Sequence, residues 1–159
     1  MSAPIYKGGK WFFKSPLRSR SDIRTSASAA VQLVPSNSGA TFLLDRASGV
    51  TYTLPAATIS GLNFTFVVTV SVTSNNHKIV AKTTGTELYI GGVFETVAAG
   101  TGTEFFPNGS SNSAITMNGT TTGGLINTIL YFQSINSTTW TIDGTVMASG
   151  TIATPFANS

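Results

Sequence analysis

Residues 61–73, with the sequence GLNFTFVVTVSVT, alternate between apolar and polar side chains. Apolar residues fall on every second position, at Leu62, Phe64, Phe66, Val68, Val70 and Val72. Only Val67 departs from this period of two. Successive side chains of a strand point to opposite faces, so the alternation predicts one long strand with one face in a core. A helix would spread the same residues around its circumference, and the segment therefore indicates a β-structured chain.

The rest of the chain between residues 31 and 147 consists of short apolar and β-branched runs separated by Gly, Asn, Ser and Pro. We expect strands at 31–34, 40–45, 50–54, 77–82, 86–90, 93–97, 113–118, 124–135, 138–142 and 145–147. The pair Gly91-Gly92 predicts a tight hairpin, and Asp143-Gly144 predicts a second one. No segment predicts a helix longer than one turn. Many short strands joined by turns favour an all-β fold, an antiparallel β-sandwich or jelly-roll.

The composition limits the classes of protein to which this chain can belong. Its 159 residues suffice for one domain with a core of its own. Cysteine is absent, which excludes a disulfide framework and a thiolate metal site. No apolar run approaches the ~20 residues of a membrane helix, and the N-terminal residues lack the apolar centre of a signal peptide. Charged residues make up only 9% of the chain, which argues against a freely dispersed monomer.

Charge is distributed unevenly along the chain. Residues 1–24 carry six basic side chains and one acidic side chain, a net charge of +5. Residues 25–159 carry three basic and five acidic side chains, a net charge of −2. We therefore divide the chain into an extended basic and aromatic N-terminal arm (1–38), a β-sandwich domain (39–147) and a C-terminal tail (148–159).

The N-terminal arm combines aromatic and basic residues in a segment with little periodicity. Rings can fill pockets of another protein while cations meet acidic groups, so this pattern is typical of an arm that docks on a partner. The expected partner-binding residues are Tyr6, Trp11, Phe12, Phe13, Lys14, Arg18, Arg20 and Arg24. Two alternatives are a solvated tail, which the composition alone would also produce, and a nucleic-acid binder. The shortness of the arm and the acidic body disfavour the nucleic-acid binder.

The candidates for catalytic chemistry are few. His77 is the only histidine and stands in a turn-like sequence, so we expect an exposed side chain rather than a metal ligand or a catalytic base. Glu87 and Glu95 would lie on opposite strands of the first predicted hairpin, which would allow a glycosidase-like pair. Their threonine-rich, polar surroundings, and those of Glu104, instead predict solvated carboxylates. We expect no enzyme activity, no cofactor and no metal.

Three stretches of the sequence resemble small virion proteins of tailed bacteriophages. They are TFLLDRASGVTYTLPAATISGLNFTFVVTVSVTSNNHKIVAK (41–82), MNGTTTGGLINTILYFQSINSTTWTIDGTV (117–146) and ATPF (153–156). In those virion proteins a Ser-Gly or similar turn, a Thr-Leu-Pro strand end, a Gly-Leu-x-Phe-x-Phe strand and a late Trp strand follow in this order. The resemblance covers residues 40–156, and the basic aromatic arm lies outside it.

The resemblance implies a β-sandwich subunit that decorates or cements a capsid, often as a trimer. It implies the major capsid protein as the partner, a homotrimer as the assembly and the exterior of the virion capsid as the location. Neither nucleic acid nor a membrane is an expected partner. Related β modules also occur in tail fibres, so the alternative is a tail-fibre or receptor-binding module. Its loops at 106–112 and 120–124 would then contact host glycans.

Overall fold

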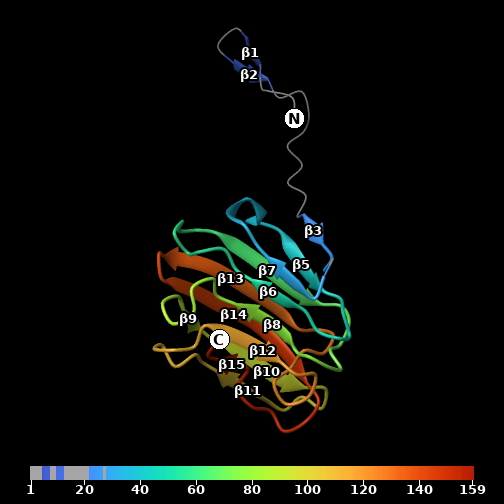
Figure 1. The fold of residues 1–159 in the computed structure, drawn as a ribbon. Coiled ribbons are helices and arrows are strands. Elements are labelled where there is room, and N and C mark those ends of the chain that lie inside the picture. Colours follow the sequence, from blue (N-terminus) through green and yellow to red (C-terminus); the bar gives the residue numbers. More distant parts are fainter. Residues whose placement is uncertain (1–4, 8–9, 13–21, 27) are drawn as a thin grey trace.

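The chain is almost entirely β-structured, as the sequence predicts. The computed structural model describes residues 5–7, 10–12, 22–26 and 28–159. Within these residues the single helical segment is a short 3-10 turn at Pro35–Asn37. Two sheets make up the body (Figure 1), and a separate antiparallel ladder joins β1 (Ile5–Lys7) to β2 (Lys10–Phe12).

The larger sheet of the body has eight strands in the order β11-β10-β14-β13-β7-β5-β3, with β9 also paired to β14. Its strands are β3 (Ile23–Arg24), β5 (Thr41–Leu44), β7 (Asn63–Val68), β9 (Leu88–Gly91), β10 (Val93–Val97), β11 (Gly102–Phe105), β13 (Ile129–Asn136) and β14 (Thr139–Ala148). The smaller sheet has five strands in the order β15-β12-β8-β6-β4. They are β4 (Ala30–Gln32), β6 (Thr51–Thr53), β8 (His77–Val80), β12 (Ala114–Met117) and β15 (Phe156–Ala157).

From β3 to β8 the chain changes sheet at every strand. As a result β3, β5 and β7 run parallel in the larger sheet, and β4, β6 and β8 run parallel in the smaller one. Parallel neighbours need a crossover connection, and here each crossover contains a strand of the other sheet instead of a helix. The amide groups of Thr73 and Ser74, in the loop after β7, both donate to Ala47 O, in the loop after β5. These two successive crossover loops therefore lie against each other. The prediction of antiparallel pairing is therefore wrong for these ladders, and a jelly-roll is not confirmed.

The two sheets share one hydrophobic core. The alternating residues of β7 place Phe64, Phe66 and Val68 inside, because every second side chain faces the smaller sheet. The ring of Phe66 meets that of Phe132 edge-on, with centroids 5.5 Å apart. Seven rings form this central cluster: Phe42, Tyr52, Phe64, Phe66, Tyr89, Phe132 and Trp140.

Two tyrosines tie the sheets together by hydrogen bonds. Tyr52 of the smaller sheet donates to Leu43 O of the larger sheet at 3.1 Å. Tyr89 of the larger sheet donates to Ile79 O of the smaller sheet at 3.2 Å. Each buried tyrosine hydroxyl thus has a hydrogen-bond partner in the facing sheet.

The strand predicted over residues 61–73 ends earlier than its alternation suggests. β7 ends at Val68, and the next two amides, of Thr69 and Val70, both donate to Leu44 O, the last carbonyl of β5. Val70 is exposed, whereas Val72 is buried within the loop that follows. The period of two therefore extends beyond the strand, because apolar loop residues also cover the core.

Neither predicted hairpin forms. β9 and β10 both pair with β14 in the parallel sense, one after the other along its length. Gly91 and Gly92 therefore connect two consecutive strands on the same side of β14. Gly91 has φ +90°, and a Cβ there would overlap Ile142 O, which explains the glycine without a hairpin. β14 continues through Asp143 and Gly144. The turn that the sequence analysis missed joins β13 to β14, where Asn136 Oδ1 accepts from the Thr138 amide at 2.9 Å.

Both ends of the described body are built into the sheets. Residues 23–24 and 30–32, which the sequence analysis assigned to the N-terminal arm, pair with β5 and β6. Phe156 pairs with Ile115 of β12, and its side chain belongs to the core. The chain thus enters the larger sheet at its edge strand β3 and ends at the edge strand β15 of the smaller sheet.

Candidate functional site

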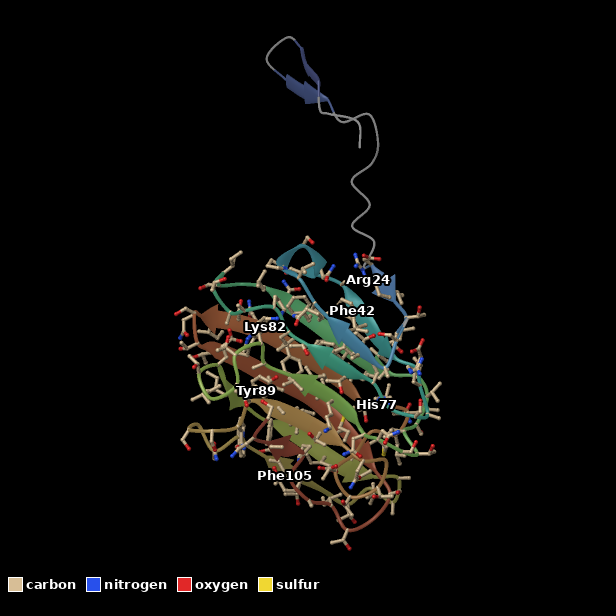
Figure 2. The ribbon with its side chains drawn as sticks, in the orientation of Figure 1. Arg24, Phe42, His77, Lys82, Tyr89 and Phe105 are labelled. Atoms are coloured by element: carbon tan, nitrogen blue, oxygen red, sulfur yellow. The ribbon has the colours of Figure 1, made fainter. Side chains whose placement is uncertain are left out.

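The expected partner-binding residues fall partly outside the described residues. Phe13, Lys14, Arg18 and Arg20 lie outside them. The backbones of Tyr6 and Trp11 stand opposite each other in the β1–β2 ladder, and Phe12 stands opposite Ile5. Arg24 is exposed on β3, at the edge of the body (Figure 2), where its guanidinium forms an ion pair with Asp22.

His77 is buried, which makes the prediction of an exposed histidine wrong. Its Nε2 lies 3.2 Å from Val70 O, while Nδ1 has no partner among the described residues. Burial lowers the pKa of His77 and so favours the neutral ring. The carboxylate of Asp45 accepts hydrogen bonds from the amide and hydroxyl of Ser26. No hydrogen bond joins His77 to either residue in the described structure, and a Ser-His-Asp triad is not assembled.

Glu87 and Glu95 are also buried, contrary to the prediction of solvated carboxylates. Glu87 is 2% exposed and accepts hydrogen bonds from the Ala57 amide at 3.0 Å and from Trp140 Nε1 at 3.4 Å. Glu95 is fully buried opposite Val146, and neither of its oxygens has a hydrogen-bond partner in the described residues.

The burial of Glu95 has an electrostatic consequence. It raises the pKa of Glu95 from its ordinary 4.5 to about 7. The alternation of β10 was a usable signal for this burial, because Glu95 falls on the same face as the buried Val93. Glu104 is exposed as predicted. β9 and β10 follow one another along the same side of β14, so Glu87 and Glu95 do not form the cross-strand pair that the predicted hairpin would have given.

The outer face of the smaller sheet carries mainly short side chains. One row across β4, β6, β8 and β12 contains Ala30, Thr51, Lys78 and Thr116. The next row contains Gln32, Thr53, Val80 and Ala114, of which Ala114 is already buried within the chain. Only Lys78 of these eight residues is charged, although the exposed Lys82 also donates to Gln32 Oε1 at 3.0 Å. The face therefore carries few charges that contact with another surface would have to desolvate.

A groove crosses the outer face of the larger sheet, and we call it the outer groove. Its first part is a shallow pocket of about 310 Å³ over β7, β13 and β14. Six polar side chains line this pocket in two rows: Thr65, Tyr131 and Asp143, then Asn63, Gln133 and Thr141. The ring of Tyr131 is 51% exposed. Asn63 donates to Gly61 O, whereas the other five polar side chains have no protein partner among the residues described.

The second part of the outer groove is a pocket of about 230 Å³ over β10, β11 and β14. The two pockets meet at Asp143, which lines both. The second pocket adds the carboxylate of Glu104 and the partly exposed rings of Phe94 and Phe106. No Lys, Arg or His lines either pocket, so the outer groove is acidic and aromatic. The sequence analysis did not identify this groove.

Comparison with known proteins does not assign the chain to a family. No known protein family matches its sequence, and no curated protein is significantly similar to it. In the part of the chain that the structure describes, no three His, Asp or Glu side chains gather to hold a metal ion. None of the described helices is both long and apolar enough to cross a membrane.

Proposed function

We propose that this protein is a capsid decoration, or cement, protein of a tailed bacteriophage. The two-layered body would be a β-sandwich on the exterior of the virion capsid, and residues 1–24, which we call the leader, would bind the major capsid protein. The separation of charge carries this proposal: the first 24 residues have a net charge of +5, whereas the body has −2. A cationic and aromatic leader can bind an acidic capsid surface. The mildly acidic body alone would be repelled by such a surface.

The position of the leader supports this assignment. It joins the body at β3, the edge strand of the larger sheet, instead of emerging from the middle of a face. A segment attached at an edge can reach a neighbouring subunit without disturbing either sheet. A subunit that binds only the assembled shell lowers the free energy of that assembled state by mass action, which is the physical basis of cementing.

The proposal includes a homotrimer. The outer face of the smaller sheet supports it, because short and mostly uncharged side chains pack closely against a second copy with little desolvation cost. The low charge content of 9% also favours a chain that buries surface against partners.

Occupancy of purified virions tests the role of the leader. We expect the Trp11→Ala and Arg18→Ser double variant to lose most of its copies per capsid. The control variant Ile126→Ala removes one exposed apolar side chain of the body, outside both the leader and the outer face of the smaller sheet. It should keep its occupancy. Equal occupancy of the two variants would refute the leader as the binding element.

The alternative function is a tail-fibre or receptor-binding module. The outer groove favours it, because a pocket with an exposed ring and with polar side chains that have no protein partner among the described residues suits a glycan. Imaging of labelled protein in the virion separates the two functions. Many copies spread over the head support decoration, whereas a few copies confined to the tail overturn it in favour of the alternative.

A further inference from the structure

The outer groove plays no part in the capsid-binding proposal, yet it has the features of a ligand site. Four polar side chains without protein partners among the described residues surround the exposed ring of Tyr131 on three adjacent strands: Thr65, Gln133, Thr141 and Asp143. We propose that the outer groove binds a neutral oligosaccharide. The proposal holds whether the protein sits on a capsid or on a tail, and it places the ligand on a sheet face instead of on loops.

The chemistry of the first pocket matches the two sides of a sugar ring. A pyranose has an apolar face of C–H groups, which can pack flat against the ring of Tyr131 and remove its apolar surface from water. Its hydroxyl groups both donate and accept hydrogen bonds. The carboxylate of Asp143 accepts, and the amides of Asn63 and Gln133 do both. A few polar groups around an apolar surface are the usual composition of a small-molecule site.

Charge argues against anionic ligands. With Asp143 and Glu104 in the groove and no basic side chain lining it, a phosphate, a nucleic acid or an acidic sugar would be repelled. An apolar ligand is disfavoured for another reason. It would desolvate Asp143 and Gln133 without giving them hydrogen bonds, which costs free energy. A neutral, hydroxyl-rich ligand avoids both penalties.

The second pocket indicates a chain of sugars and not a single one. The distance from β13 to β11 spans three strand spacings, or ~14 Å. Both ends of this span carry exposed aromatic surface: Tyr131 on β13, and Phe106 directly after β11, with 66% of its surface exposed. Asp143 lies between them because it lines both pockets. The groove is built mainly on paired strands, so binding would lose little conformational entropy.

Calorimetric titration of the full-length protein tests the proposal. The probes are neutral gluco-, galacto-, manno- and N-acetylglucosamine oligomers of one to four units. We expect saturable binding of at least one series, with affinity rising with length. Tyr131→Ala should weaken binding at least ~30-fold and Asp143→Asn at least ~10-fold, whereas Tyr131→Phe should change it less than ~3-fold. Thermal melting of each variant verifies folding.

Matched controls separate the groove from general surface effects. Ile126→Ala removes a residue as exposed as Tyr131, at 51%, but outside the groove, and should leave affinity unchanged. Phe106→Ala should weaken binding of the longest oligomer but not of the shortest. The proposal is overturned if no oligomer binds saturably at millimolar concentration, or if Tyr131→Ala binds like the wild type. It is equally overturned if Tyr131→Ala abolishes self-association instead, because the groove would then be a contact between copies.

Discussion

Trp140 Nε1 donates a hydrogen bond to Glu87 Oε2 at 3.4 Å inside the core shared by the two sheets. The second oxygen of Glu87 accepts from the Ala57 amide at 3.0 Å. One buried carboxylate therefore satisfies two donors, an indole of β14 and a backbone amide in the loop after β6. A carboxylate in such a place has a structural role, because each donor would otherwise be buried without a partner.

Replacing Glu87 should therefore destabilise the fold strongly. Glu87→Leu leaves both donors unpaired, and we expect a loss of about 2–5 kcal/mol in the free energy of unfolding. Urea unfolding can be followed by the fluorescence of Trp140 in a Trp11→Phe background, since the chain has two tryptophans. Glu87→Gln should cost less, because one acceptor oxygen remains. The exposed Glu104→Gln is the control, and an equal effect of both glutamines would contradict this role of Glu87.

The individual strands of the body could largely be predicted from sequence, whereas their pairing could not. β5, β6, β8 and β12 lie within predicted strands, because alternation and the surrounding turn residues are local signals. Pairing depends on which distant edges meet. Gly91-Gly92 looks like a hairpin turn in sequence, but the Gly92 amide donates to Ile142 O at 3.1 Å and holds the chain along β14. Nothing near the glycines encodes that partner.

The difference between local signals and strand pairing also explains why the sequence analysis missed the outer groove. Alternation puts Tyr131 and Gln133 on one face of β13, but only the adjacency of β7 and β14 makes a groove of them. The sequence analysis judged His77 by its turn-like sequence and Glu95 by its polar, threonine-rich surroundings, and therefore expected both to be exposed. The period of their own strands places each on the buried face, next to Ile79 and Val93. Local periodicity was the better guide to burial here.

The centre of the aromatic cluster should be sensitive to truncation. Phe66 is fully buried and contacts the rings of Phe42, Tyr52 and Phe132. Phe66→Ala should cost about 3–5 kcal/mol through lost burial and the cavity that remains. Chemical denaturation measures this loss. Phe106→Ala removes the same side chain from an exposed position and should cost less than about 0.5 kcal/mol. A comparable loss in both variants would contradict the assignment of Phe66 to the core.

The stability of the protein should depend on the protonation of Glu95. Its pKa is about 7 in the folded state against 4.5 ordinarily, so the folded state keeps a proton that the unfolded state releases. This contribution to stability is fully present below pH 4.5 and is lost as the pH rises to about 7, by no more than about 3 kcal/mol. His77 acts in the opposite direction. Its lowered pKa removes stability as the pH falls below its ordinary 6.5.

A Glu95→Gln variant isolates the first contribution, because glutamine has a similar shape but does not ionise. The difference in unfolding free energy between this variant and the wild type should shift in favour of the variant between pH 4.5 and about 7, then level off. Urea unfolding at closely spaced pH values measures this difference. A pH-independent difference for Glu95→Gln would mean that the buried carboxyl ionises normally.

Gly91 should be intolerant of any side chain, since it combines a left-handed backbone with a close approach to β14. Its φ is +90°, and an added Cβ would overlap Ile142 O. Gly100 has a similar φ of +83° but no atom within 4 Å of an added Cβ. Gly100→Ala should therefore cost only the backbone strain, ~1 kcal/mol, whereas Gly91→Ala should cost about 1–3 kcal/mol more. Thermal melting of the two variants measures the difference, and equal melting temperatures would show that β9 does not lie against β14 at this point.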